Sequence, residues 1–317
     1  MYFGSIKFFK HLIVIVLALV LSALGLMVVL LSIENDSLKE QLAAFTDPQE
    51  PPSEPTDFFN KKPPLNAQEP SDEPPTESPL WPPAPSGEYA HLFPDLYAVV
   101  PQSEIEHYEE NPHYIYMTFD DGPNYMTRAI LDHLQKTDIK ATFFVVPSES
   151  RAGLLRQIRD EGHAIGVHSY SHAFTEVYSS VEAYLEDFHK ARELIYEQTG
   201  IWSDFFRFPG GSRNDYNKEV RADIITEMHR RGFVYFDWNV DSNDVRGATH
   251  DTMLREVRLE IAANFERGER SIVLFHDAAT YTSWVVGNLI EKLQESTTPY
   301  EFRTINMNTK PHMWHGS

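Results

Sequence analysis

The stretch Tyr114-Ile-Tyr-Met-Thr-Phe-Asp-Asp-Gly-Pro123 carries the strongest structural signal in the chain. Tyr114 to Phe119 are β-prone and mostly apolar, which predicts a strand, and the Asp-Asp-Gly-Pro run that follows is typical of a turn. A strand that is apolar along nearly its whole length is covered on both faces, as in a parallel sheet. The stretch therefore predicts a buried parallel strand with two carboxylates at its end.

The same pattern repeats on the C-terminal side of this strand. Further short apolar runs predict strands at 141–146, 163–167, 205–208, 233–236 and 271–275. Amphipathic segments between and after them predict helices at 127–136, 154–160, 181–198, 217–231, 253–265 and 284–294. Such alternation is typical of an α/β fold with helices outside a parallel sheet. With six or seven units in about 200 residues, we predict a (β/α) barrel rather than an open sheet.

The composition excludes several classes of function. Lys and Arg total 27 against 47 Asp and Glu, a formal net charge of −20, so the chain would repel nucleic acid. The sequence contains no cysteine, which excludes disulfides, thiolate zinc sites and thiol nucleophiles. Any bound metal must therefore be held by His, Asp or Glu.

Residues 12–33 form an apolar run of 22 residues without charge, long enough for a helix to span a bilayer. Lys7 and Lys10 precede the run, and acidic residues follow it, so the positive-inside rule places the tail 1–11 in the cytoplasm. A cleaved signal peptide has a shorter apolar region and a small-residue cleavage site. We therefore predict an uncleaved transmembrane signal anchor in the cell membrane, with cleavage as the alternative.

The remaining segments differ in composition. Residues 34–46 predict a short juxtamembrane helix, and 47–87 predict a disordered but extended linker rich in Pro and acids, because 13 of the 21 prolines lie there. Residues 88–112 precede the barrel and carry enough aromatic residues to pack loosely on it. The main folded domain is predicted at 113–310, and 311–317 form a C-terminal tail.

Polar residues gather where the predicted strands end. In a parallel barrel the active site lies at the C-terminal ends of the strands. Five strands are followed there by acids, imidazoles or a guanidinium: Asp120 and Asp121, His168 and His172, Arg207, Asp241 and Asp244, and His276. We therefore predict that these residues share one rim of the barrel.

His168 and His172 are four residues apart, a spacing that lets two rings share one metal. Taken alone, this pair is better explained as solvated or core histidines, and Asp120-Asp121 as an ordinary turn. Together they form a set of two imidazoles and a carboxylate, which leaves coordination positions open. The second carboxylate remains free to take a proton from a metal-bound water.

Five segments, in this order, resemble the motifs of the polysaccharide deacetylases, the NodB-homology domain of carbohydrate esterase family 4. They are Thr118-Phe-Asp-Asp-Gly-Pro123, His168-Ser-Tyr-Ser-His172, Arg207-Phe-Pro-Gly-Gly211, Asp241-Ser-Asn-Asp244 and Leu274-Phe-His276. The resemblance covers residues 113–308, roughly two-thirds of the chain. It implies a distorted (β/α) barrel and metal-dependent hydrolysis of an N-acetyl group.

The resemblance also implies a role for each motif residue. Asp121, His168 and His172 would bind one divalent metal, usually zinc, although such a set also accepts Co, Mn, Ni or Fe. Asp120 would be the general base that activates water, and Arg207 would pair with it and keep it ionised. His276 would be the general acid, and Asp244 would orient it, with Asp241 less favoured for that task. The backbone N–H of Gly210 would donate a hydrogen bond to the oxyanion.

Two positions depart from the family pattern. Gly210 stands where the third motif usually has Tyr, and Val245 where the fourth usually has Trp. The backbone donor survives, but the substrate groove loses aromatic walls, unless Trp238 compensates; a core tryptophan is the alternative for that residue. The groove would then be lined by Pro209, Val245 and Leu274.

These features together favour an N-deacetylase acting on peptidoglycan N-acetylglucosamine, since an anchor and a spacer would hold the site near the cell wall. Deacetylation of an exopolysaccharide or of chitooligosaccharides, and O-acetyl ester hydrolysis, remain alternative reactions. A catalytically inactive wall-glycan-binding module is the alternative outside the enzymes. The occupied catalytic positions argue against it.

Four further residues invite functional interpretation. His163 is better explained as a structural histidine near the barrel floor than as a ligand. Asp277 could support His276 or simply belong to a turn, and His312 and His315 are expected to be solvated.

Overall fold

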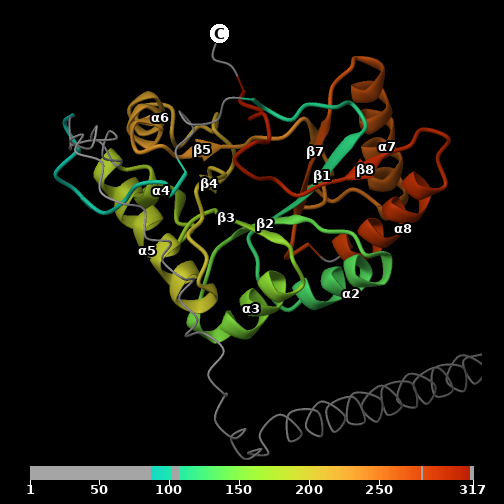
Figure 1. Ribbon diagram of the computed structural model, residues 1–317, viewed down its shortest axis with the longest axis horizontal. Helices are drawn as coiled ribbons and strands as arrows, with labels where there is room; N and C mark the ends of the chain where they lie inside the picture. The colour runs from blue at the N-terminus through green and yellow to red at the C-terminus, as the bar shows by residue number, and fades with distance from the viewer. Residues whose placement is uncertain (1–86, 101–106, 280, 315–317) are drawn as a thin grey trace, which may run out of the picture. The chain divides into compact units, whose positions relative to one another are not determined.

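The computed structural model describes residues 87–100, 107–279 and 281–314 (Figure 1). The predicted cytoplasmic tail, transmembrane anchor, juxtamembrane helix and nearly all of the linker lie outside these residues, as does His315. Within the described ranges, no helix has both the length and the apolar character needed to cross a bilayer.

Short strands alternate with helices throughout the described domain. The strands are β1 (Tyr114–Asp120), β2 (Thr142–Val145), β3 (Ala164–Val167), β4 (Phe205–Phe206), β5 (Val234–Tyr235), β6 (Val240–Asp241), β7 (Ser271–His276) and β8 (Glu301–Phe302). The helices are α2 (Thr127–Thr137), α3 (Ala152–Asp160), α4 (Phe174–Val177), α5 (Val181–Thr199), α6 (Arg221–Arg230), α7 (His250–Glu266) and α8 (Thr282–Gln294), with a 3-10 turn at Glu149–Arg151.

All the strands pair in parallel, in the order β5-β4-β3-β2-β1-β7-β6, and β8 adds to β1. The predicted parallel α/β architecture is confirmed, but the sheet is a curled half-barrel, because β5 and β6 do not pair among the described residues. The backbone beyond β5 bonds elsewhere, since the N–H of Asp237 donates to the carbonyl of His312 at 2.8 Å. The C-terminal segment thus takes up a backbone hydrogen bond just beyond β5.

The curled sheet has two apolar faces. The helices lie around its outside (Figure 1) and pack on alternate strand residues such as Met117, Phe143 and Phe275. The opposite, inner face carries the residues in between, and the C-terminal segment covers it. This inner cluster comprises Tyr116, Phe144, Phe205, Val234, Phe236, Ile272 and Ile305. Because strand side chains alternate with a period of two, each strand supplies both layers.

Some elements differ from the prediction. The predicted strands 205–208 and 233–236 shorten to two paired residues each, and α4, β6 and β8 are short elements that the sequence pattern did not indicate. Helix α6 begins at Arg221 instead of 217, because the side chain of Asn214 accepts hydrogen bonds from the N–H groups of Tyr216 and Asn217 and holds that stretch in turns.

Residues 87–100 pack closely on the domain, with Leu96 and Tyr97 buried. Their anchor is Arg231, which is fully buried at the end of α6. Its guanidinium donates to Glu227 Oε1 and, at 2.8–3.1 Å, to four carbonyl oxygens of this segment: those of Tyr89, Leu92, Phe93 and Leu96. Because the guanidinium is buried, water cannot take its place as the hydrogen-bond donor to these carbonyls.

Candidate metal and catalytic site

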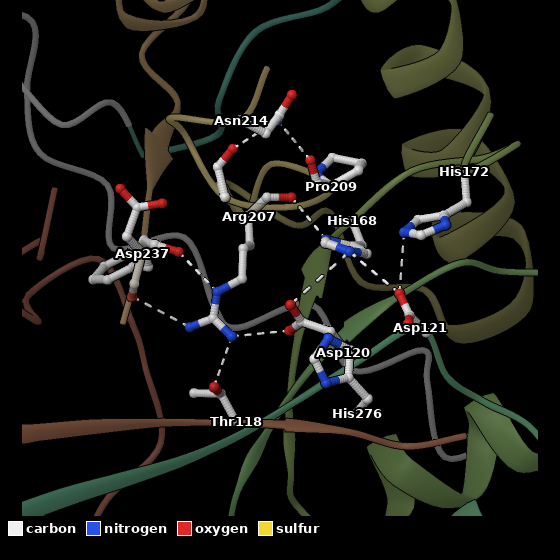
Figure 2. Close-up of polar contacts among 12 residues, drawn as sticks. Thr118, Asp120, Asp121, His168, His172, Arg207, Pro209, Asn214, Asp237 and His276 are labelled. Atoms are coloured by element: carbon white, nitrogen blue, oxygen red, sulfur yellow. Dashed lines mark hydrogen bonds and ion pairs between the residues drawn. The ribbon is translucent and has the colours of Figure 1, made fainter. Parts of the chain in front are cut away.

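The inner face of the sheet delivers the polar residues to one rim. Four polar residues lie two positions after a residue on the inner face of the same strand: Asp120, His168, Arg207 and His276. Because strand side chains alternate, all four point toward the mouth of the half-barrel. Asp120 lies directly opposite His276 in the β1–β7 register. Side chains from four strands thus meet around one point (Figure 2).

Asp121, His168 and His172 form a group that could hold a metal. Asp121 Oδ1 lies 3.4 Å from His168 Nε2 and 3.1 Å from His172 Nε2, and the three donor atoms lie within 4.8 Å of one another. His168 Nδ1 lies 2.9 Å from the carbonyl oxygen of Arg207, to which it donates its proton. With Nδ1 as the donor, Nε2 faces Asp121 and can ligate a metal when it carries no proton, as a metal-ligating histidine requires. The donor set therefore fits a divalent cation.

The charges around this group favour the binding of a positive ion. Burial alone would raise the pKa of Asp121, but hydrogen bonds from the two imidazoles lower it far below its usual range. Burial opposes the charged form of His168, yet the carboxylates of Asp120 and Asp121 raise its pKa. A proton and a metal ion therefore compete for the same place.

Asp120 belongs to a different interaction. Its Oδ1 accepts a hydrogen bond of 2.9 Å from Arg207 Nη1, while its Oδ2 stays 3.9 Å from His168 Nε2. The guanidinium is fully buried and also donates to Thr118 Oγ1 and to the carbonyl of Phe236. The two adjacent carboxylates are thus divided, Asp121 toward the imidazoles and Asp120 toward the guanidinium (Figure 2).

His276 is fixed by Asp244. The carboxylate of Asp244 accepts hydrogen bonds from the His276 backbone N–H at 2.7 Å and from its Nδ1 at 2.8 Å, and it also accepts one from Thr282 Oγ1 at 2.6 Å. Although burial opposes protonation, the Asp244 hydrogen bond and the carboxylates of the rim raise the pKa of His276 to about 9. The ring is therefore protonated at neutral pH. Asp241 instead accepts from the N–H of Asn243 and lies 3.8 Å from Arg246.

The loop after β4 carries the predicted oxyanion donor. Gly210 is exposed with φ +74°, and its backbone N–H has no hydrogen-bond partner among the described residues. A Cβ at this position would lie 2.8 Å from Phe174 Cε1, so Phe174 takes the space beside the glycine. Of the predicted groove residues, Val245 is 58% exposed, Leu274 is buried, and the carbonyl of Pro209 accepts from Tyr178 Oη.

Two acids hold the site from behind, and sequence reasoning missed one of them, Asp187. Asp187 on α5 accepts hydrogen bonds of 2.6–2.8 Å from Ser169 Oγ and from the N–H groups of Tyr170 and Ser171, which fixes the loop between the two imidazoles. Asp277 is fully buried and accepts from Thr127 Oγ1 at 2.7 Å; burial raises its pKa to about 7. Only its place beside His276 marks Asp277 in the sequence, and nothing marks Asp187.

Other candidate residues have structural surroundings. His163 is buried, and its Nδ1 accepts from the N–H of Ala141, as expected of a structural histidine. His189 lies between Asp95 and Glu193 on the surface, but its Nε2 faces the first carboxylate and its Nδ1 the second, so the ring bridges two acids. We assign no function to that group.

The chain matches known proteins over this same region. Residues 107–232 match the family model described as polysaccharide deacetylase. A Bacillus subtilis protein, YheN, provisionally named a polysaccharide deacetylase, is 33% identical over 186 residues, which are 57% of this chain and 64% of YheN. A peptidoglycan-N-acetylglucosamine deacetylase of Bacillus cereus is 28% identical over 204 residues, or 63% of this chain and 72% of that protein.

A solved structure supports the same relationship. The catalytic domain of a peptidoglycan N-acetylglucosamine deacetylase from Eubacterium rectale superposes with a TM-score of 0.60 at 28% identity, covering 65% of this chain and 94% of that domain. The fold and rim define an α/β protein with a possible Asp-His-His metal site at the mouth of a curled sheet. More particularly, the chain carries a polysaccharide deacetylase domain of the NodB-like type, carbohydrate esterase family 4.

Proposed function

We propose that this chain is a metal-dependent N-deacetylase that removes the acetyl group from N-acetylglucosamine in peptidoglycan. One observation carries the proposal: the adjacent carboxylates separate into a metal-facing Asp121 and a guanidinium-bound Asp120. A hydrolase of this kind needs both, one as ligand and one as base. The name of the Bacillus cereus relative supports the choice of glycan.

Asp121, His168 and His172 are the residues that would hold the cation. A divalent metal bound there supplies Lewis-acid polarisation and lowers the pKa of water. Two imidazoles and one carboxylate are a common zinc donor set, so zinc is the ion we propose, while Co, Mn, Ni and Fe accept the same donors. Asp120, oriented by its hydrogen bond from Arg207, takes a proton from the attacking water.

His276 and Gly210 complete the reaction. As water adds to the acetamide carbon, the exposed N–H of Gly210 donates to the developing oxyanion. His276, protonated and oriented by Asp244, gives its proton to the glucosamine nitrogen as the carbon–nitrogen bond breaks. Acetate leaves, and the amine remains on the sugar.

The proposal includes a location. Residues 12–33 anchor the chain in the cell membrane, with 1–11 in the cytoplasm and the deacetylase domain outside, where peptidoglycan lies. The uncharged run of 22 residues and the lysines before it support this arrangement. Residues 47–87 then serve as the spacer between the membrane and the domain.

Mass spectrometry of muropeptides tests the activity. The full chain in detergent, loaded with zinc, is expected to remove acetyl groups from purified peptidoglycan. Asp120→Asn should abolish turnover while zinc still binds, because Asp121 and both imidazoles remain. Asp241→Asn, a matched change on the same rim outside the proposed chemistry, should retain activity. Turnover by Asp120→Asn at the wild-type rate would contradict the assigned base.

The same assay separates the alternatives. Gly210 and Val245 alter the groove, so chitooligosaccharides, a deacetylatable exopolysaccharide and acetylated xylan are tested beside peptidoglycan. Preferred release of acetate from one of these would reassign the substrate. A wild-type chain that binds wall glycan without releasing acetate would instead identify an inactive binding module.

A further inference from the structure

The C-terminal segment His312–Trp314 lies against the loop that follows β4. A Cβ placed on Gly211 would come within 2.5 Å of Trp314 Cζ3, so the indole fills the space that a side chain there would need. The indole N–H donates to the carbonyl of Trp238 at 2.9 Å, and the two tryptophan rings meet edge to face with centroids 4.4 Å apart. Trp314 is thus wedged between this loop and Trp238, which lies in the segment between β5 and β6.

Asp237 joins the segment to the loop. This carboxylate is fully buried, and it accepts hydrogen bonds from the N–H and Oγ of Ser212 at 2.8 and 2.6 Å and from the N–H of Trp314 at 2.9 Å. The backbone N–H of Asp237 donates to the carbonyl of His312 at 2.8 Å. Because all these groups are internal to the domain, breaking one leaves a polar atom without a partner.

The residues just after β5 also hold the guanidinium of Arg207. Arg207 donates through Nε to the carbonyl of Phe236 at 2.8 Å and through Nη2 to the carbonyl of Asp237 at 3.3 Å. Figure 2 shows Asp237 and Asp120 on opposite sides of this guanidinium. A shift of the residues after β5 would therefore displace Arg207 and, through it, Asp120. A shift of the loop at Gly211 would displace the backbone N–H of Gly210.

We propose that Trp314 is a positioning residue of the deacetylase site, acting through Asp237 on the loop that presents Gly210 and on the strand end that holds Arg207. The inference rests on the proposed function. Among the hydrogen bonds and ion pairs of the described residues, neither Trp314 nor Asp237 contacts the three proposed metal ligands. Loss of the wedge should therefore lower turnover and leave metal affinity unchanged.

Steady-state kinetics of the full, zinc-loaded chain test this assignment. Trp314→Ala is expected to lower kcat about tenfold or more, because oriented donors lose their effect when displaced by even 1 Å. KM should stay within about twofold, since Trp314 is assigned no contact with substrate. Trp314→Phe keeps a ring beside Gly211 without the indole N–H, so its kcat should lie between those of the other two chains.

Trp202 provides a matched control. It is a half-exposed tryptophan before β4, stacked on Tyr196 with ring centroids 4.1 Å apart. Trp202→Ala removes the same atoms at the opposite end of that strand, so it should keep the wild-type kcat even if the melting temperature falls. A loss of kcat in Trp314→Ala alone, measured well below its melting temperature, separates positioning from general destabilisation.

A double-mutant cycle tests the route through Asp237. Asp237→Asn replaces one carboxylate oxygen with an NH₂ group, which accepts no hydrogen bond, so the three donors of Ser212 and Trp314 can no longer all be accepted as before. If Trp314 acts through this carboxylate, Asp237→Asn combined with Trp314→Ala should lower kcat less than the product of the single effects. Independent, multiplicative effects would overturn the assigned route.

The outcomes distinguish the two proposals. A wild-type chain without deacetylase activity on any glycan overturns the proposed function. An active wild-type chain with unchanged kcat in Trp314→Ala overturns only the positioning role. A raised KM with unchanged kcat also overturns it, because Trp314 would then belong to the substrate groove.

Discussion

At the scale of single residues, the pair His276–Asp244 is expected to set the basic limb of the pH dependence of turnover. The proposed general acid, His276, must be protonated, and its pKa is raised to about 9, so kcat should fall as the pH rises through about 9. Asp244→Asn removes the hydrogen-bonded carboxylate, so this basic limb should move toward the ordinary value of 6.5. A pH series of kcat for wild type, Asp244→Asn and the control Asp241→Asn measures the shift; an unmoved limb in Asp244→Asn would refute the assignment.

Asp277 affects stability with the opposite sign to most carboxylates. Its pKa is raised from 3.8 to about 7, so the folded state binds this proton more tightly than the unfolded state, and stability falls as pH rises from about 4 to 7. Asp277→Asn cannot ionise. In metal-free protein it should leave the free energy of unfolding nearly unchanged at pH 4 and raise it at pH 8 by up to about 4 kcal/mol.

Urea titrations at the two pH values measure that difference. Asp251→Asn, on the exposed surface of α7, serves as the control and should show no comparable gain at pH 8. An Asp277→Asn protein that is equally destabilised at both pH values would show that the carboxylate contributes a specific contact instead.

The site residues could be predicted from the sequence because strand alternation and strand ends are local features. Asp120 and His276 are the last residues of their strands, while His168 and Arg207 follow theirs directly. The structure brings all four to one rim. Asp187 and Asp237 could not be found in this way. Their side chains bond to segments distant in sequence, Asp187 to the loop at 169–171 and Asp237 to Ser212 and Trp314. Their spacing in the sequence resembles that of any surface acid.

At the scale of elements, Arg231 at the end of α6 controls the segment 87–100. Arg231→Lys loses the fork that donates to four carbonyls, and a lysine ammonium cannot reproduce it. We expect a loss of about 3 kcal/mol in the free energy of unfolding, since these acceptors are left inside the domain.

Thermal unfolding compares this variant with its neighbour. Arg230 also pairs with Glu227 but remains partly exposed, so Arg230→Lys should cost no more than about 1 kcal/mol. Equal losses in the two variants would mean that the carbonyl contacts of Arg231 do not anchor the segment.

The elements with a clear period could be predicted, and those without one could not. Helices α2, α5 and α8 have amphipathic sequences, and β1 and β7 have long apolar runs. By contrast, β6 and β8 have two residues each, too few to show alternation, and their pairing depends on neighbours distant in the chain. The closure of the sheet was uncertain for the same reason, because it depends on what bonds beyond β5.

At the scale of the whole molecule, metal and fold should be coupled. A cation that binds the native Asp121, His168 and His172 stabilises the protein by mass action, by about 4 kcal/mol at roughly a thousand times its dissociation constant. Chelation should therefore lower the melting temperature of the domain, and added zinc should restore it.

Calorimetry with and without zinc measures this coupling. His172→Ala should remove the zinc-dependent shift, whereas His189→Ala, in the surface group with Asp95 and Glu193, should retain it. A shift that disappears only in His189→Ala would move the binding site to the group of Asp95, His189 and Glu193.

The alternation along β1 also limits how this protein can change in length. Tyr116, Thr118 and Asp120 share the inner face, so the insertion of one codon within the strand would rotate every later side chain to the opposite face and exchange base for ligand. Insertion of two codons would keep each later side chain on its original face and would only displace it along the strand. Natural insertions and deletions in related genes should therefore be confined to the connecting loops or, inside the strands, arrive in pairs.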